Sequence, residues 1–252
     1  MTRYLTLILV HLWAATALRG QPLLPIATDR PDQTECPFIV PKGYFQAENG
    51  FVYEKTDANS HAIAYPSVLW KYGLSDNFEF RLITERVSEK VLNDIKKGFT
   101  PITVGFKVRL MEEKGILPKT SFIGHLDIPT LASKSFRTDF YAPSFRFTMQ
   151  HTLSERLILA YNLGAQWDGT TPETTFIYTL TTGLSFTEKL GAYVELYGFA
   201  PQNQSVDHRF DGGLTYLISS NVMIDVSGGI GLSHNAPNYF IALGLSYRFK
   251  VR

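Results

Sequence analysis

Three residues with the chemistry of a hydrolase, Ser121, His125 and Asp127, lie at alternate positions of one segment of the chain. A serine, a histidine and an acid can form a nucleophilic triad when hydrogen bonds link their side chains. In an extended segment, however, four residues span about 13 Å, which separates the hydroxyl from the imidazole. We therefore predict no catalytic residues, and we predict that the chain is not an enzyme.

Histidine and cysteine show no spacing typical of metal ligands. His125, His151 and His208 fall on separate segments, and Cys36 is the single cysteine, which excludes an internal disulfide and a cysteine-based zinc cluster. The run 228–231, Gly-Gly-Ile-Gly, lies within one extended segment and precedes another, unlike a phosphate-binding loop. We predict neither a metal nor a cofactor.

Charged residues are balanced overall, with 24 Lys and Arg against 23 Asp and Glu. A nucleic-acid partner would need a basic excess on one face, so we predict no nucleic-acid binding. Many charges recur at every second position: Lys107 and Arg109 alternate with Phe106, Val108 and Leu110. Side chains alternate between the two faces of a strand, so this period predicts strands with one polar and one apolar face.

Twelve such segments follow one another, and many are ten to fourteen residues long. A tilted strand needs about nine to eleven residues to cross a bilayer, more than strands of soluble sheets usually have. Short turns containing a hydroxyl residue, such as 153–156 and 186–189, alternate with longer polar links, as in outer-membrane barrels. We predict an all-β transmembrane antiparallel up-and-down barrel of about twelve strands; a periplasmic β-sandwich is the alternative. The predicted strands are 43–55, 62–72, 78–86, 100–111, 119–129, 140–151, 156–167, 173–186, 190–200, 208–218, 221–232 and 238–249, and the longer links are 87–99, 130–139, 168–172, 201–207 and 233–237.

The charged face is assigned to the lumen, because twelve inward apolar faces could not fill so wide a circle. Acids and bases on this face nearly balance, which predicts mutual pairing, with Glu79 beside both Lys71 and Lys107, rather than a ring of one sign. Closure of the barrel sets Gln46 opposite Arg248 and predicts a charge-assisted contact between Glu48 and Arg248. The predicted lumen-lining residues, forming a pathway or a closing network, are Glu48, Lys71, Glu79, Arg81, Lys107, Arg109, His125, Asp127, Arg146, Glu195, Asp211, Asp225 and Arg248.

The N-terminus has the layout of a secretory signal peptide. Arg3 precedes an apolar stretch, and small residues follow before Gln21. This stretch is too short for a stop-transfer helix. We predict a cleaved signal peptide over residues 1–20, a periplasmic leader and possible plug over 21–42, and the barrel over 43–252.

Several short motifs carry a resemblance to a known family: 28–34 with its Asp-Arg-Pro, 40–43, 72–79 and 244–249. Together they resemble the bacterial outer-membrane "transporter" family named for a putative MetA-pathway of phenol degradation. The resemblance covers nearly the whole mature chain. It implies an exported barrel in the bacterial outer membrane that passes hydrophobic or aromatic compounds, and it transfers no binding residues.

Our leading functional hypothesis is a passive conduit for small hydrophobic or aromatic solutes. The alternative is a structural or interaction barrel whose lumen is closed by internal salt bridges; an outer-membrane lipid-modifying enzyme is a distant third. Glycines that leave room in the lumen favour a passage, whereas the charges and the leader favour closure; these glycines are Gly183, Gly213, Gly229 and Gly244. Expected partners are the lipid bilayer, an unidentified small solute, and the barrel-assembly machinery, which would read Tyr247 and Phe249 near the C-terminus.

Overall fold

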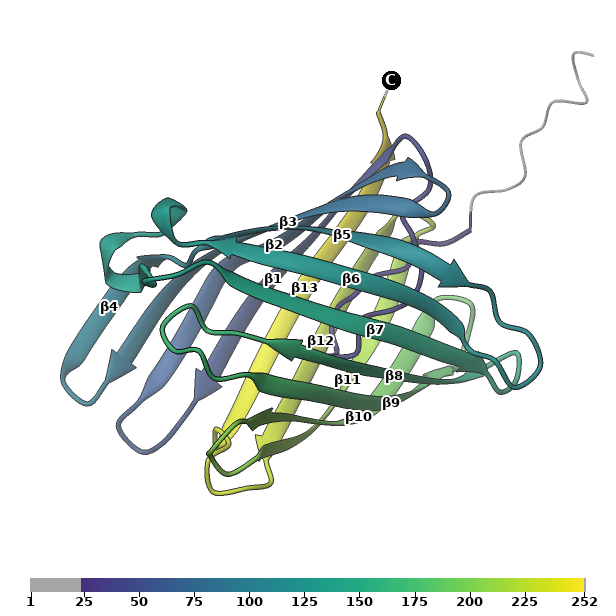
Figure 1. Cartoon of the computed structure of the whole chain (residues 1–252). Helices are drawn as coiled ribbons and strands as arrows, with labels where there is room; N and C mark the ends of the chain where they lie inside the picture. The colour runs from purple at the N-terminus through teal and green to yellow at the C-terminus, as the bar shows by residue number, and fades with distance from the viewer. Residues whose placement is uncertain (1–23, 252) are drawn as a thin grey trace, which may run out of the picture.

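The computed structural model describes residues 24–251 and forms one closed antiparallel barrel (Figure 1). The predicted signal peptide, residues 1–20, lies outside the described residues and stays a prediction. No helix within 24–251 is long and apolar enough to cross a membrane. The strands are β1 Tyr44–Lys55, β2 His61–Ser75, β3 Phe78–Val91, β4 Asp94–Phe99, β5 Ile102–Met111, β6 Lys119–Ile128, β7 Ala142–Thr152, β8 Leu157–Gln166, β9 Thr175–Ser185, β10 Leu190–Pro201, β11 Asp207–Ser219, β12 Val222–Gly231 and β13 Tyr239–Lys250.

Each barrel strand pairs with its neighbours along the chain, and β1 pairs with β13 over its whole length to close the circle. Twelve strands form the barrel, which confirms the predicted architecture and excludes the β-sandwich. The seam has the predicted register, with Gln46 opposite Arg248.

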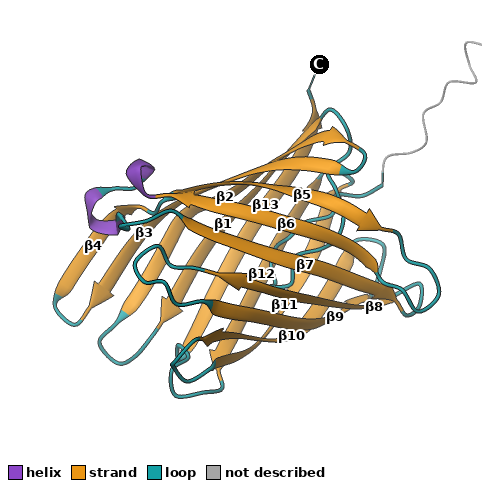
Figure 2. Cartoon of the chain, in the orientation of Figure 1, coloured by secondary structure: helices purple, strands orange, loops and turns teal. Residues whose placement is uncertain are grey.

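Two of the predicted loops contain regular structure. Residues 87–99 extend the barrel wall as a hairpin, because β3 continues to Val91 and pairs there with β4. The link 130–139 includes most of one 3₁₀ helix, Pro129–Leu131, and the whole of a second, Lys134–Phe136 (Figure 2). The β4 hairpin was missed because nearly all its residues are exposed, so no apolar face marks it as a strand.

The barrel exposes apolar side chains and buries polar ones, the reverse of a soluble protein. On β13, Ile241, Leu243 and Leu245 are 51%, 52% and 45% exposed, while Ala242 and Ser246 on the other face are buried. Outward aromatic rings continue this surface around the wall; Phe78 and Phe106, for instance, stack at 5.8 Å between ring centroids. So continuous an apolar exterior suits lipid rather than water, and the chain is a transmembrane barrel of the outer-membrane type.

The short turns close as their residue types predict. Ser154 Oγ accepts hydrogen bonds from the backbone N–H groups of Arg156 and Leu157, and Thr187 Oγ1 accepts them from Lys189 and Leu190. A hydroxyl that holds two backbone donors replaces the ladder bonds lost where the chain reverses. These turns lie at the same end of the barrel as the start of β1 and the end of β13.

Candidate functional site

The leader enters the barrel, reaches the middle of the lumen and returns to the end where it entered (Figure 1). The N–H of Ile26 bonds the carbonyl of Ser220 in the β11–β12 turn, and farther along Glu35 reaches Asn162 inside β8. The leader then returns to Gly43, whose N–H bonds the carbonyl of Gly73 near the end of β2. Residues 24–42 therefore lie on the inner side of the barrel wall, in the lumen that the strands enclose.

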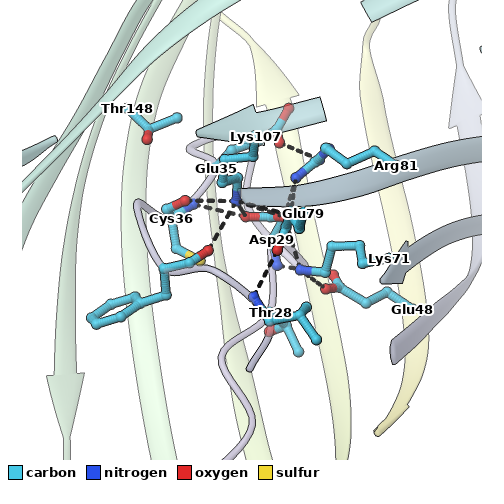
Figure 3. A network of polar contacts seen from close by, with 12 residues as sticks. Thr28, Asp29, Glu35, Cys36, Glu48, Lys71, Glu79, Arg81, Lys107 and Thr148 are labelled. Carbon is cyan, nitrogen blue, oxygen red and sulfur yellow. Dashed lines mark hydrogen bonds and ion pairs between the residues drawn. The ribbon is translucent and has the colours of Figure 1, made fainter. Parts of the chain in front are cut away.

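Asp29 of the leader binds three basic side chains of the wall (Figure 3). Its carboxylate lies 3.0 Å from Lys71 Nζ, 2.8 Å from Arg81 Nη1 and 2.8 Å from Lys107 Nζ. It also accepts a hydrogen bond from the N–H of Cys36 at 3.0 Å. Burial alone would raise the pKa of Asp29, but the three cations hold it well below its usual value. We call these four charged residues the Asp29 cluster.

Glutamates of the wall bind the leader through its backbone. Glu48 accepts the N–H groups of Asp29 and Arg30 at 2.9 and 3.2 Å. Glu195 accepts those of Gln33 and Thr34, each at 2.8 Å. The leader has no strand or helix of its own, so its buried backbone donors need such partners, and ionised acceptors make the stronger bonds.

One further glutamate and one amide of the wall complete this pattern. Glu79 accepts the N–H of Val40 at 2.7 Å. Asn162 makes both possible backbone bonds to Glu35, accepting its N–H at 2.8 Å and donating to its carbonyl at 3.0 Å. Side chains of the wall thus hydrogen-bond the leader along its length, as a binding protein holds a bound peptide.

Arg30 binds the opposite part of the wall. Its guanidinium lies 3.1 Å from Asp225 and donates to the carbonyl of Leu243. A Cβ at Gly50 would clash with Arg30 Nη1, and one at Gly244 would clash with Asp225 Oδ2. Side chains lying flat against the wall therefore require glycine at both positions.

Neighbouring side chains also fill the space at most of the glycines that we expected to leave room in the lumen. Tyr193 covers Gly213, Ile158 covers Gly183, and Asp211 with Phe240 covers Gly229, each within 3 Å of where a Cβ would stand. At Gly213, Gly229 and Gly244 the missing side chain makes space for a neighbour, whereas Gly183 also lines a cavity beside the leader.

The structure brings most of the predicted lumen residues to the leader. Lys71, Arg81 and Lys107 belong to the Asp29 cluster, while Glu48, Glu79, Glu195 and Asp225 bind the leader as described. Arg146 donates to the carbonyl of Gln33, and Arg248 to that of Leu24. His125 accepts a bond from Arg81, and Asp211 lies opposite Glu195. Asp127 binds Thr103, and Arg109 pairs with Glu112 beyond the strand end, so neither meets the leader.

Two predicted charge contacts are wrong. Glu48 and Arg248 do not touch: Glu48 pairs with Lys71, and Arg248 binds Asn221 and the carbonyls of Leu24 and Ser220. Lys71 pairs with Glu48 and Asp29 rather than with Glu79. In both cases the leader supplies a competing partner, since Asp29 binds Lys71 and the carbonyl of Leu24 binds Arg248.

Ser121, His125 and Asp127 have separate partners. Ser121 donates to the carbonyl of Pro37, His125 accepts from Arg81, and Asp127 accepts from Thr103. Within residues 24–251, no group of three or more His, Cys, Asp or Glu side chains could hold a metal ion. Cys36 is a free thiol, and burial raises its pKa to about 12, which keeps it protonated and unreactive.

Sequence reasoning missed the leader's own share of the site: Asp29, Arg30, Asp32 and Glu35. Their signal was visible, since four charged residues fall within seven positions of a segment otherwise rich in apolar residues and proline. Charge alone, however, did not tell whether the segment faces solvent or the lumen.

A closed barrel with its N-terminal leader bound in the lumen defines the class of this protein: a transmembrane barrel with an internal segment. The chain belongs to the family described as putative MetA-pathway of phenol degradation, whose sequence profile matches residues 28–249, which confirms the resemblance noted in the sequence. No curated protein matches the chain.

Solved structures share the fold at low sequence identity. The COG4313 outer membrane channel from Pseudomonas putida F1 has a TM-score of 0.68 and 14% identity, over 87% of this chain and 99% of that chain. The KdgM porin has a TM-score of 0.54 and 12% identity, over 80% of this chain and 99% of that one. The NanC porin has a TM-score of 0.54 and 7% identity, over 81% and 98% respectively. These likenesses concern the architecture.

Proposed function

We propose that this protein is a passive outer-membrane conduit for small hydrophobic or aromatic solutes, and that its leader acts as a plug that controls the lumen. The class of solute follows the family's description, which concerns phenol degradation. The conduit follows the likeness to proteins named as a channel and as porins. Non-enzymatic transport also agrees with the separate partners of Ser121, His125 and Asp127.

The observation that carries the proposal is how the leader is held. It is bound by side chains, largely through its backbone, and it is not a strand of the wall. Such a segment can shift without opening the ladder that closes the barrel. Beside it a cavity of about 220 Å³ separates residues 30–32 from the inner faces of β8–β11, room for roughly seven waters at ~30 Å³ each.

The Asp29 cluster supports a second candidate, a structural barrel whose lumen is permanently closed. Three basic side chains, each at most 1% exposed, meet one carboxylate, and breaking such a buried network by removing one member is costly. On this hypothesis the leader is an internal brace that never leaves.

Single-channel recording of the full mature chain in planar bilayers distinguishes the two. A conduit gives discrete current steps, and phenol added to either side interrupts them while it occupies the lumen. Asp29→Asn, which loosens the leader, should increase the time spent open; Glu188→Gln, in the exposed β9–β10 turn, is the matched control. Silence from both the wild type and Asp29→Asn would favour the structural barrel.

A further inference from the structure

Charge is distributed unevenly across the lumen, although its total is balanced. Toward β2, β3 and β5, the acids are matched by Lys71, Arg81 and Lys107. Toward β10 and β11, Glu195 lies directly opposite Asp211 in the ladder. No ion pair joins either carboxylate to a basic side chain in the described part of the chain.

The leader adds another acid to this side. Asp32 stands beside Glu195 and Asp211, and burial first, then the Glu195 carboxylate, raises the pKa of Asp32 well above its usual value. Burial raises this pKa whatever the local potential, and only the contributions of Glu195 and Asp211 report that these acids lie close to Asp32. Asp225 on β12 is compensated by Arg30 at 3.1 Å, so Arg30 does not neutralise the other three carboxylates.

Polar atoms without a protein partner gather on the same side. Six buried side-chain atoms within residues 24–251 make no hydrogen bond, and five of them belong to Arg30 or to the inner faces of β11–β13. These five atoms are Arg30 Nε, Asp211 Oδ1, Asp225 Oδ2, Ser227 Oγ and Ser246 Oγ. Asp211 itself is only 1% exposed. A buried carboxylate oxygen without a donor is costly unless water or a cation reaches it.

The 220 Å³ cavity borders this group. Arg30, Asp32, Thr181, Tyr193 and Thr215 line it, together with small and apolar residues of β8–β10. The Tyr193 hydroxyl donates to Asp211 Oδ2 at 3.4 Å, which places Asp211 directly behind the cavity wall. The cavity therefore touches Arg30 and, through Tyr193, adjoins Asp211, and both residues have a buried polar atom without a partner.

We propose that ions pass the leader on this side, between residues 30–32 and the inner faces of β8–β12, and that this path selects small cations, inorganic or ammonium, over anions. The inference rests on the proposed conduit function. Acidic side chains in a narrow, partly desolvated passage lower the energy of a cation and raise that of an anion. Two other arginines lie away from the cavity: Arg209 is paired with Glu54 and Asp207 near the other mouth, and Arg248, which no acid neutralises, is bound beside Leu24 and does not line the cavity.

The reversal potential of the full chain, recorded across a planar bilayer with a KCl gradient, tests this directly. We expect potassium to be several-fold more permeant than chloride. Asp211→Asn keeps the shape of the side chain and should move the reversal potential toward zero. Glu188→Gln removes an acid from the exposed β9–β10 turn and should leave the potential unchanged.

A second variant keeps the test valid if Asp211→Asn fails to fold. Thr215→Lys places a cation on the cavity wall while leaving Asp211 in place, and it should shift the potential in the same direction. Heat-modifiable migration in detergent gels verifies that each variant is a closed barrel.

The outcomes separate the two proposals. Current with a reversal potential at zero, or on the chloride side, would overturn the cation path and leave the conduit standing. Cation selectivity that neither Asp211→Asn nor Thr215→Lys alters would place the path elsewhere and overturn the assignment. Absence of current from the wild type and from Asp29→Asn alike would overturn the conduit as well.

Discussion

Replacing Asp29 by asparagine should release the leader while the barrel stays closed. The amide keeps the size of the carboxylate and can still accept the N–H of Cys36. It removes the one charge that Lys71, Arg81 and Lys107 share, at 3.0, 2.8 and 2.8 Å. The wall strands retain all their ladder bonds, so the loss falls on the binding of the leader.

The size of the effect follows from the burial of the cluster. Removing one member of a buried charge network costs about 3–5 kcal/mol. Glu48, Glu79 and Glu35 still compensate the three cations in part, so we take the lower end of that range. About 3 kcal/mol corresponds to roughly a hundredfold larger population with the leader released.

Cys36 supplies the assay, because it is the single cysteine of the chain and lies in the leader. Its thiol is unreactive while the leader is bound, since burial raises its pKa to about 12. A small thiol reagent should therefore modify Cys36 in Asp29→Asn roughly a hundredfold faster than in the wild type, in proportion to the released population. Asp57→Asn, in the exposed β1–β2 loop, should react at the wild-type rate.

One result would refute this reasoning. If Asp29→Asn migrates as a closed barrel in unboiled gels yet Cys36 reacts at the wild-type rate, then Asp29 does not hold the leader. The buried network would then stabilise the wall rather than the leader.

Three further predictions concern pH, topology and the seam. The pKa of Asp29 in the folded chain lies below its ordinary value, so ionised Asp29 stabilises the bound leader fully at any pH above the unfolded pKa. The leader should therefore stay bound from pH 8 down to roughly pH 4 and be released only below it. A rate of Cys36 modification, corrected for thiolate fraction, that rose between pH 7 and pH 5 would contradict this. An impermeant thiol reagent applied to whole cells should label Asn203→Cys in the β10–β11 link but not Ser154→Cys in the β7–β8 turn, and the reverse pattern would invert the orientation. Because Glu48 and Arg248 have separate partners, Glu48→Gln and Arg248→Gln should lower the gel-shift unfolding temperature independently, and a coupling above about 0.5 kcal/mol would restore the contact between them.

The barrel could be predicted from the sequence because period two and strand length are local signals. The alternation of Ile241, Leu243 and Leu245 with small or polar residues fixes both the strand and its lipid face. The seam register, Gln46 opposite Arg248, follows from hairpin geometry applied strand by strand. The β4 hairpin escaped prediction because its short strand, Asp94–Phe99, shows no alternation of apolar and polar residues.

The site was predicted less completely because Asp29, the acid that its basic residues share, belongs to no ladder. Strand periodicity identified Glu48, Lys71 and Glu79 as inward, but it could only pair them with adjacent strands. Asp29 draws Lys71 and Lys107 together from β2 and β5, which do not pair with each other. An irregular segment has no period, so nothing in the sequence indicates where along the lumen its charges will stand.

The contacts of Arg30 constrain the order of assembly. Arg30 belongs to the segment that runs into β1, yet it is bonded to Asp225 on β12 and to Leu243 on β13, so the leader crosses the join between first and last strands from the inside. A cylinder already sealed offers the leader no side entrance, and it would have to be fed back through the mouth. Enclosure as β13 arrives avoids that step. With that order of events, Lys71, Arg81 and Lys107 would meet their shared counter-charge only as the circle closes.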